Sequence, residues 1–226
     1  MSDDGDLTPL SNDPESLTEY CIRIGLDPET FSFNEIFSFD EEMLQMVPRP
    51  VYSVIFLYPV GGDDGPLEQR HSEEIKLSGS VPWFTLQTVP NACGTIAVIH
   101  SILNNQERFN IIPDSWISKF ISKSKEMTPE QRAEYIEGND EIQELHEDAA
   151  VEDDTPVTED SSTNHFIAFV KHDGKLWELD GRKPQPICHG PAESLLEAAV
   201  AVLNRDFIPN IDDPMRISAV ALCGNA

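Results

Sequence analysis

Four residues of this chain have the types, and the order along the sequence, that a cysteine-dependent hydrolase needs: Gln87, Cys93, His165 and Asp180. A cysteine thiolate attacks a carbonyl carbon, a histidine moves the proton, and a carboxylate holds the histidine in the reactive tautomer. A side-chain amide shortly before the cysteine can donate a hydrogen bond to the oxyanion. If the fold brings these side chains together, they predict acyl transfer through a covalent cysteine intermediate.

Cys93 lies in the segment 90–95 (PNACGT), at the first turn of a helix predicted over 92–103. Unpaired backbone N–H groups and the helix dipole favour a thiolate there, and Gly94 lets a substrate backbone approach closely. Apolar residues occupy nearly every side of this helix, so we expect it in the middle of the domain. Position alone leaves open that Cys93 is a buried core cysteine, as we expect for Cys21 and Cys223.

His165 and Asp180 lie on two predicted strands that flank a turn at Asp173 and Gly174. A four-residue connection would place His165 directly opposite Asp180, on the same face and within side-chain contact. A two-residue turn would instead place His165 opposite Arg182, so the pairing depends on the loop type. An ordinary cross-strand hydrogen bond is the structural alternative for this pair.

The other histidines and cysteines do not suggest a further site. Cys188 and His189 are adjacent but lack two further ligands at suitable spacing, so we predict no metal and no cofactor. We expect His100 to be a packed, hydrogen-bonded core residue. Three histidines in polar segments are predicted to be exposed and non-catalytic: His71, His146 and His172.

The hydrophobic pattern predicts a mixed α/β (α+β) domain, with helices packed on a mostly antiparallel sheet. A nearly continuous apolar run at 51–60, bounded by proline and glycine, indicates a buried central strand. Further strands are expected at 164–171, 176–180 and 216–223, with a short extended segment at 84–89. Helices are expected at 14–24, 41–46, 116–122, 129–137 and 191–205.

Three segments are expected to lie outside this framework. Residues 1–12 are polar and predicted to be flexible, and residues 61–80 are predicted to form a loop and polar linker. Residues 138–163 contain ten Asp or Glu and no Lys or Arg, which predicts a long solvated loop with at most one helical turn near 142–147. We expect residues 1–226 to form a single catalytic domain.

The charge balance limits the partners. The chain has 41 Asp and Glu against 15 Lys and Arg, a formal net charge of −26. Such a surface repels nucleic acids and anionic membranes, and attracts a basic protein or peptide. Mere solubility is the alternative explanation.

The N-terminus lacks the apolar region of a signal peptide, and no apolar run approaches the length of a membrane span. The four cysteines are scattered and do not suggest a disulfide framework. We therefore expect a protein of the cytoplasm, with the nucleus as the alternative.

Several strings closely resemble motifs of the ubiquitin C-terminal hydrolase family. The string 87–95 (QTVPNACGT), followed by Ile99 and His100, resembles the nucleophile motif. The strings 165–168 (HFIA) and 178–184 (ELDGRKP) resemble the histidine and aspartate motifs. The resemblance extends to 46–50 (MVPRP) and 128–133 (TPEQRA), and it covers nearly the whole chain. The short, single-domain members of the family are the nearest type.

The resemblance implies a papain-like fold with a threaded, knotted backbone, and a loop at 138–163 that crosses over the active site and restricts leaving-group size. It implies Cys93 as nucleophile, His165 as general acid and base, Asp180 as its orienting group and Gln87 in the oxyanion hole. Leu86 departs from the pattern, where a basic or polar residue is expected. The implied activity is hydrolysis of small adducts or peptides from the C-terminal glycine of ubiquitin.

Three other functions remain open at this point. The chain could act on Nedd8, which shares the Gly-Gly end of ubiquitin. It could be a catalytically silent ubiquitin-binding module whose triad is never aligned. A transglutaminase or acyltransferase would use the same residues, but the sequence suggests no second acyl-acceptor site. We expect a monomer.

Overall fold

The computed structural model describes residues 7–60, 80–152 and 164–225, so the predicted linker lies outside it except for Ser80. The described strands form one six-stranded sheet in the order β1-β6-β2-β3-β4-β5, antiparallel throughout. Their bounds are β1 Phe31–Glu35, β2 Val51–Pro59, β3 Asn164–His172, β4 Lys175–Leu179, β5 Ile187–Pro191 and β6 Ser218–Gly224. The predicted α/β class with an antiparallel sheet is confirmed.

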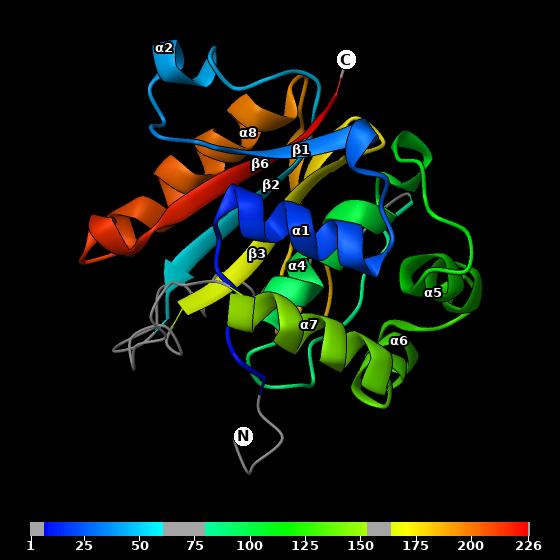
Figure 1. Cartoon of the computed structure of the whole chain (residues 1–226). Coiled ribbons are helices and arrows are strands. Elements are labelled where there is room, and N and C mark those ends of the chain that lie inside the picture. The colour runs from blue at the N-terminus through cyan, green and yellow to red at the C-terminus, as the bar shows by residue number, and fades with distance from the viewer. Residues whose placement is uncertain (1–6, 61–79, 153–163, 226) are drawn as a thin grey trace.

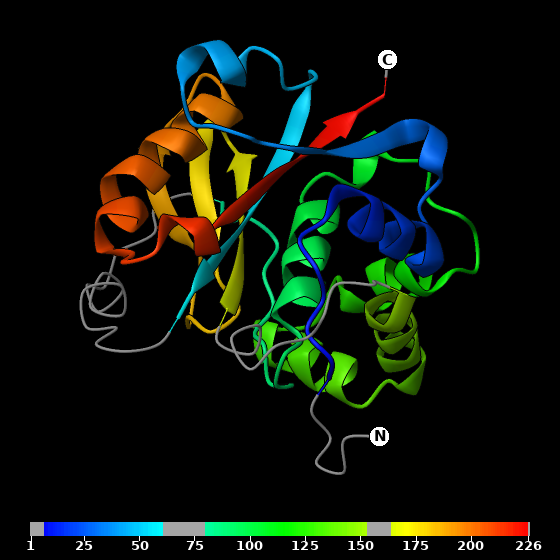
Figure 2. The ribbon, with the colours of Figure 1, turned by 60° about the vertical axis from the view of Figure 1, so that its left-hand side comes forward.

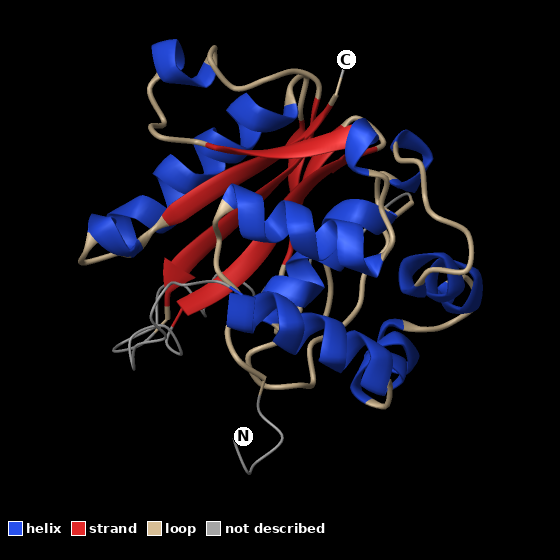
Figure 3. Ribbon diagram, in the orientation of Figure 1, coloured by secondary structure: helices blue, strands red, loops and turns tan. Residues whose placement is uncertain are grey.

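The helices lie in two layers on opposite faces of this sheet (Figure 1, Figure 3). One layer contains α4 against β2 and β3, with α1 and α7 outside it and α5 and α6 beside it. The other face is covered by α8, which packs on β2, β3 and β4. The helix bounds are α1 Pro14–Ile24, α2 Glu41–Leu44, α4 Cys93–Leu103, α5 Trp116–Ser124, α6 Pro129–Glu137, α7 Asp140–Glu152 and α8 Leu195–Val202.

The strand β2 and the helix α4 behave as their composition predicts. β2 lies inside the sheet with α4 on one face and α8 on the other, which explains its nearly continuous apolar sequence. Every residue of α4 is buried. The segment 84–89 is not a strand, because its backbone bonds to helix side chains and to a loop instead of a sheet neighbour. Thr85 N–H donates to His100 Nε2 of α4 at 3.2 Å, and Gln87 N–H donates to Gly181 O at 2.8 Å.

Short elements connect the main ones. The predicted helix at 191–205 is α8 followed by a π-helical stretch, Leu203–Phe207. Single 3₁₀ turns lie at Pro28–Thr30, Gln106–Arg108, Ile208–Asn210 and Pro214–Arg216. The edge strands β1 and β5 were not predicted; β5 (ICHGP) contains Gly and Pro and lacks an alternating pattern.

The prediction of a solvated loop across 138–163 is wrong for its first half, which forms the 13-residue helix α7. The physical reason is a narrow apolar stripe: Ile142, His146, Ala149 and Ala150 are buried at helical spacing, while the acidic residues fill the other faces. His146 is therefore buried and not exposed as predicted. Residues 153–163, the remainder of the predicted crossover loop, lie outside the described residues.

The N-terminal segment, residues 7–12, is also more ordered than predicted. Leu10 and Asn12 are buried, and Leu7 N–H donates to Pro90 O at 3.4 Å. Figure 2 shows this dark-blue segment passing along the helical layer before it enters α1. The predicted flexibility of residues 1–12 therefore does not hold for residues 7–12.

No helix among the described residues combines the length and the apolar character needed to cross a bilayer.

Candidate active site

Cys93 is the first residue of α4, and it is 6% exposed. Ala92 at the N-cap offers no side-chain hydrogen bond to the first helical turn. Asn91, with φ of 60°, makes the sharp turn that precedes the helix, a conformation that asparagine tolerates better than most residues. The thiol is therefore held beside backbone N–H groups and the positive end of the helix dipole.

The structure joins His165, at the start of β3, to Asp180, just beyond β4. His165 Nε2 and Asp180 Oδ1 are 2.7 Å apart, and the two side chains are 1% and 2% exposed. The backbone N–H of Arg182 donates to the same carboxylate oxygen at 2.9 Å. The carboxylate is thus fixed on two sides and fixes the imidazole in turn.

The strand register differs from the one that would place these residues directly opposite each other. Asp173 and Gly174 form a two-residue turn with φ of 48° and 70°, as in a type I′ hairpin. Ala168 pairs with Leu179, so the extended register would place His165 opposite Arg182. Asp180 is then the diagonal neighbour of His165 on the same side of the hairpin, which its side chain spans.

Besides Asp180, His165 also interacts electrostatically with Cys93. Nδ1 is buried and has no hydrogen-bond partner within the described residues, and the ring and the thiol interact without an aligned hydrogen bond. The backbone N–H of Phe166, the residue after His165, also lowers the pKa of the thiol. The start of β3 therefore meets the first turn of α4.

The electrostatics of the three groups agree with one another. Burial raises the pKa of Cys93, but His165, Phe166 N–H and the charge of Arg182 together outweigh it and hold the pKa below its ordinary value. Burial lowers the pKa of His165, but Asp180 and then Cys93 raise it above its ordinary value. Burial raises the pKa of Asp180, but His165, the Arg182 N–H and the charge of Lys183 together outweigh it and hold the pKa below its ordinary value. These directions favour a thiolate–imidazolium pair beside an ionised carboxylate.

Gln87 lies beside this group on the segment that leads into α4. Its Nε2 donates to Val89 O at 3.2 Å, and its Oε1 is buried with no partner in the described part of the chain. A Cβ at Gly181 would lie 3.0 Å from Gln87 Cβ and 2.9 Å from Ile96 Cγ2. The bare backbone after Asp180 therefore lets the Gln87 segment and α4 pack against it.

His100, two turns further along α4, contacts the segment that precedes Gln87. It is fully buried, its ring stacks on Phe84 at 5.0 Å, and its Nε2 lies 3.1 Å from Thr85 O. Burial lowers the pKa of His100 to about 4. Its predicted place as a packed, hydrogen-bonded core residue is confirmed.

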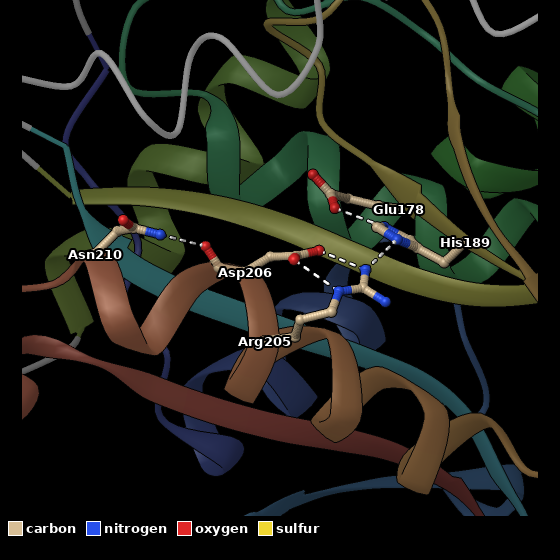
Figure 4. Close-up of polar contacts among 5 residues, drawn as sticks. All are labelled: Glu178, His189, Arg205, Asp206 and Asn210. Carbon is tan, nitrogen blue, oxygen red and sulfur yellow. Dashed lines mark hydrogen bonds and ion pairs between the residues drawn. The ribbon is translucent and has the colours of Figure 1, made fainter.

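The predicted site residues therefore converge, whereas the remaining histidines lie elsewhere. His189 binds Glu178 at 2.8 Å on the α8 side of the sheet, with Arg205 and Asp206 beside it (Figure 4). His172 is half-buried, and His71 lies outside the described residues. Within residues 7–60, 80–152 and 164–225, no group of three His, Cys, Asp or Glu side chains is arranged to hold a metal ion.

Sequence reasoning missed Gly181 and a buried network around His146. Gly181 lies within the string ELDGRKP, so its close contact could have been suspected from a glycine directly after the carboxylate. The His146 network joins three segments that are distant in the sequence, and only the apolar stripe of α7 signals it.

The sequence of this chain is similar to that of known proteins. The sequence model of the family described as ubiquitin carboxyl-terminal hydrolase, family 1, matches residues 7–208. Ubiquitin carboxyl-terminal hydrolase 3 of Arabidopsis thaliana is 36% identical over 201 residues, covering 87% of this chain and 86% of that protein. Human ubiquitin carboxyl-terminal hydrolase isozyme L1 is 36% identical over 221 residues, covering 96% and 98%.

The fold is shared with a solved structure. The Trichinella spiralis UCH37 catalytic domain, bound to ubiquitin vinyl methyl ester, superposes with a TM-score of 0.76 at 19% identity. The match covers 98% of this chain and 97% of that one. At this identity the likeness shows a common fold.

Proposed function

This chain belongs to the ubiquitin carboxyl-terminal hydrolase family, family 1, and on that basis we propose that it cleaves adducts from the C-terminal glycine of ubiquitin. It is a cysteine-type hydrolase, a deubiquitinase, with Cys93 as the proposed nucleophile. One observation supports this most: His165 bonds a buried carboxylate 2.7 Å away and lowers the pKa of the Cys93 thiol.

The first chemical step is attack of the Cys93 thiolate on the carbonyl carbon of the last glycine. The C–S bond forms as the carbonyl becomes an oxyanion, and Gln87 Nε2 and the Cys93 N–H donate to it. Each such donor contributes roughly 3 kcal/mol in comparable sites. Gln87 Nε2 carries two N–H groups; one donates to Val89 O in the free protein, which leaves the other for the oxyanion.

The second step expels the leaving group. His165, protonated beside Asp180, gives its proton to the departing amine as the C–N bond breaks, which leaves a thioester on Cys93. His165 then takes a proton from water, whose oxygen attacks the thioester. Breaking the C–S bond releases the ubiquitin carboxylate and restores the thiolate.

The acidic surface supports ubiquitin as the partner, because its C-terminal tail is basic and a net charge of −26 attracts it. The two glycines at the end of that tail suit a narrow approach to a nucleophile that is 6% exposed. Nedd8 shares this end, so a preference between the two modifiers is part of the proposal to be tested. We also propose a monomer that acts in the cytoplasm.

The test is to incubate the protein with ubiquitin carrying a C-terminal electrophile and to measure intact mass, beside Cys93→Ala and beside the same electrophile on Nedd8. We expect a one-to-one adduct with ubiquitin that Cys93→Ala abolishes. Binding without an adduct would identify a silent ubiquitin-binding module, and an adduct in Cys93→Ala would refute the nucleophile. Faster reaction with Nedd8 would identify a hydrolase of that modifier.

A further inference from the structure

The N-terminal segment (residues 7–12) lies directly against the turn that presents the proposed nucleophile. Asn91 Nδ2 donates to Leu7 O at 2.9 Å, and Leu7 N–H donates to Pro90 O at 3.4 Å. A Cβ at Gly94 would lie 3.0 Å from Leu10 Cβ, so this segment also packs on the helix just after the nucleophile. It therefore contacts the chain on both sides of Cys93.

His146 of α7 connects this segment to α4 through a buried chain of hydrogen bonds. Its Nε2 lies 2.6 Å from Thr8 O, and its Nδ1 lies 2.8 Å from Thr95 Oγ1. Thr95 Oγ1 is also 2.7 Å from the Tyr20 hydroxyl of α1. His146, Thr95 and Tyr20 are all fully or almost fully buried.

The direction of each bond in this chain is fixed by chemistry. A carbonyl oxygen can only accept, so Nε2–H of His146 donates to Thr8 O. In the neutral ring Nδ1 then accepts, and the Thr95 hydroxyl donates to it. Tyr20 therefore donates to Thr95, because the hydroxyl hydrogen of Thr95 is already used. Burial lowers the pKa of His146, in accord with a neutral ring.

The helix α7 also binds the N-terminal segment through Glu147. Thr8 N–H donates to Glu147 Oε1 at 2.8 Å, and the Thr8 hydroxyl donates to Glu147 Oε2 at 2.9 Å. The residues 146 and 147 thus hold all three backbone and side-chain polar groups of Thr8. Since Thr95 is two residues after Cys93, the network ends in the first turn of the nucleophile's helix.

We propose that His146, Thr95, Thr8 and Glu147 form a clamp that positions Cys93 relative to His165, with His146 as its central positioning residue. The clamp fixes α7 and the N-terminal segment against the first turn of α4. It acts on the same site as the proposed function, and this inference rests on that function. Because this hydrogen-bond network has one allowed set of donors and acceptors, it admits one arrangement of the N-terminal segment, α4 and α7. Small displacements of a nucleophile are costly, since about 1 Å can reduce a rate about 100-fold.

The experiment compares Thr95→Val, which keeps the side-chain shape but removes the hydroxyl, with Thr95→Ser, which keeps the hydroxyl. We expect Thr95→Val to lower kcat on a ubiquitin C-terminal amide about tenfold with KM within about twofold. Thr95→Ser should stay within about twofold of the parent. Ser101→Ala is the matched control, because it removes another buried hydroxyl from α4, one that bonds Ser53 at 2.7 Å far from Cys93.

A second readout does not need ubiquitin. The rate at which iodoacetamide alkylates Cys93, followed by peptide mass spectrometry from pH 5 to 9, reports the thiolate and its surroundings. We expect Thr95→Val to move this pH profile and Ser101→Ala to leave it unchanged. A clamp that served stability alone would lower the melting temperature of Thr95→Val without moving its alkylation profile.

A second variant covers the case in which Thr95→Val does not fold. Glu147→Ala removes the outer half of the clamp, and Glu144→Ala removes the same charge from an exposed position one turn earlier on α7. The proposal is overturned if the folded Thr95→Val or Glu147→Ala variants match their controls in both kcat and alkylation profile. If no ubiquitin substrate is turned over by the parent, the proposed function fails, while the alkylation comparison still decides the clamp.

Discussion

Acid should destabilise this fold through His100, and the magnitude follows from its burial. The ring is fully buried, stacked on Phe84 and bonded to Thr85, and burial lowers its pKa to about 4. In the unfolded chain a histidine has a pKa of about 6.5. Because the unfolded state then binds the proton more tightly, stability is lost as the pH falls from about 6.5 to about 4.

The size of the effect can be worked out from these two values. Their difference corresponds to about 3 kcal/mol once the pH lies below both, since each pH unit is worth about 1.4 kcal/mol. Between pH 7 and pH 5 the share of His100 is about 2 kcal/mol, a large part of the stability of a typical domain. The segment that His100 holds leads to Gln87, so the loss would also loosen the candidate oxyanion donor.

The assay is urea unfolding of the parent and of His100→Gln, each at pH 7 and pH 5. Carboxylates and His146 titrate alike in both proteins, so their contributions cancel when the two pH dependences are subtracted. We expect His100→Gln to be less stable at pH 7 but to lose about 2 kcal/mol less than the parent on going to pH 5. Equal losses in the two proteins, with unchanged m-values, would refute the reasoning.

Four further outcomes are expected around the site. Asp180→Asn should lower kcat by about 10⁴-fold while ubiquitin binding, measured by calorimetry, persists. Gln87→Ala should lower kcat about 10²- to 10³-fold in steady-state assays with little change in KM, and an unchanged kcat would remove it from the oxyanion hole. Gly181→Ala should cost about 1 to 3 kcal/mol in urea unfolding, because its Cβ would press on Gln87. His165→Ala should shift the pH midpoint of Cys93 alkylation upward, since His165 lowers the pKa of the thiol; an unmoved midpoint would mean that the two do not interact in solution.

The elements that could be predicted from the sequence are those whose signal is local. The helix α1 begins at Pro14 with Asp13 as its N-cap and ends at Gly25, which has φ of 117°. In α6, Thr128 and Gln131 form a capping box. Caps and apolar runs depend on neighbours a few residues away, so sequence suffices.

The features that escaped prediction depend on distant contacts. The helix α7 has an acidic composition typical of a loop, and its stability comes from a few buried residues that pack on α1 and the N-terminal segment. His146 lies in a polar stretch of the sequence. It can nevertheless be buried in the fold, because Thr8 and Thr95 satisfy both of its ring nitrogens. Neither partner could be identified without knowing which segments meet.

The contact between His165 and Asp180 shows why the site could be predicted despite an open register. The direct register and the observed one differ by two residues, and side chains two residues apart on a strand point to the same side. The sequence left two registers open, one of which placed Asp180 directly opposite His165. In the structure Asp180 is a diagonal neighbour instead, and it still reaches His165 at 2.7 Å. A slip of one residue would have turned the carboxylate to the other side of the hairpin and left the imidazole without it. The prediction thus required only the parity of the pairing, and the two-residue turn at Asp173 and Gly174 preserves that parity.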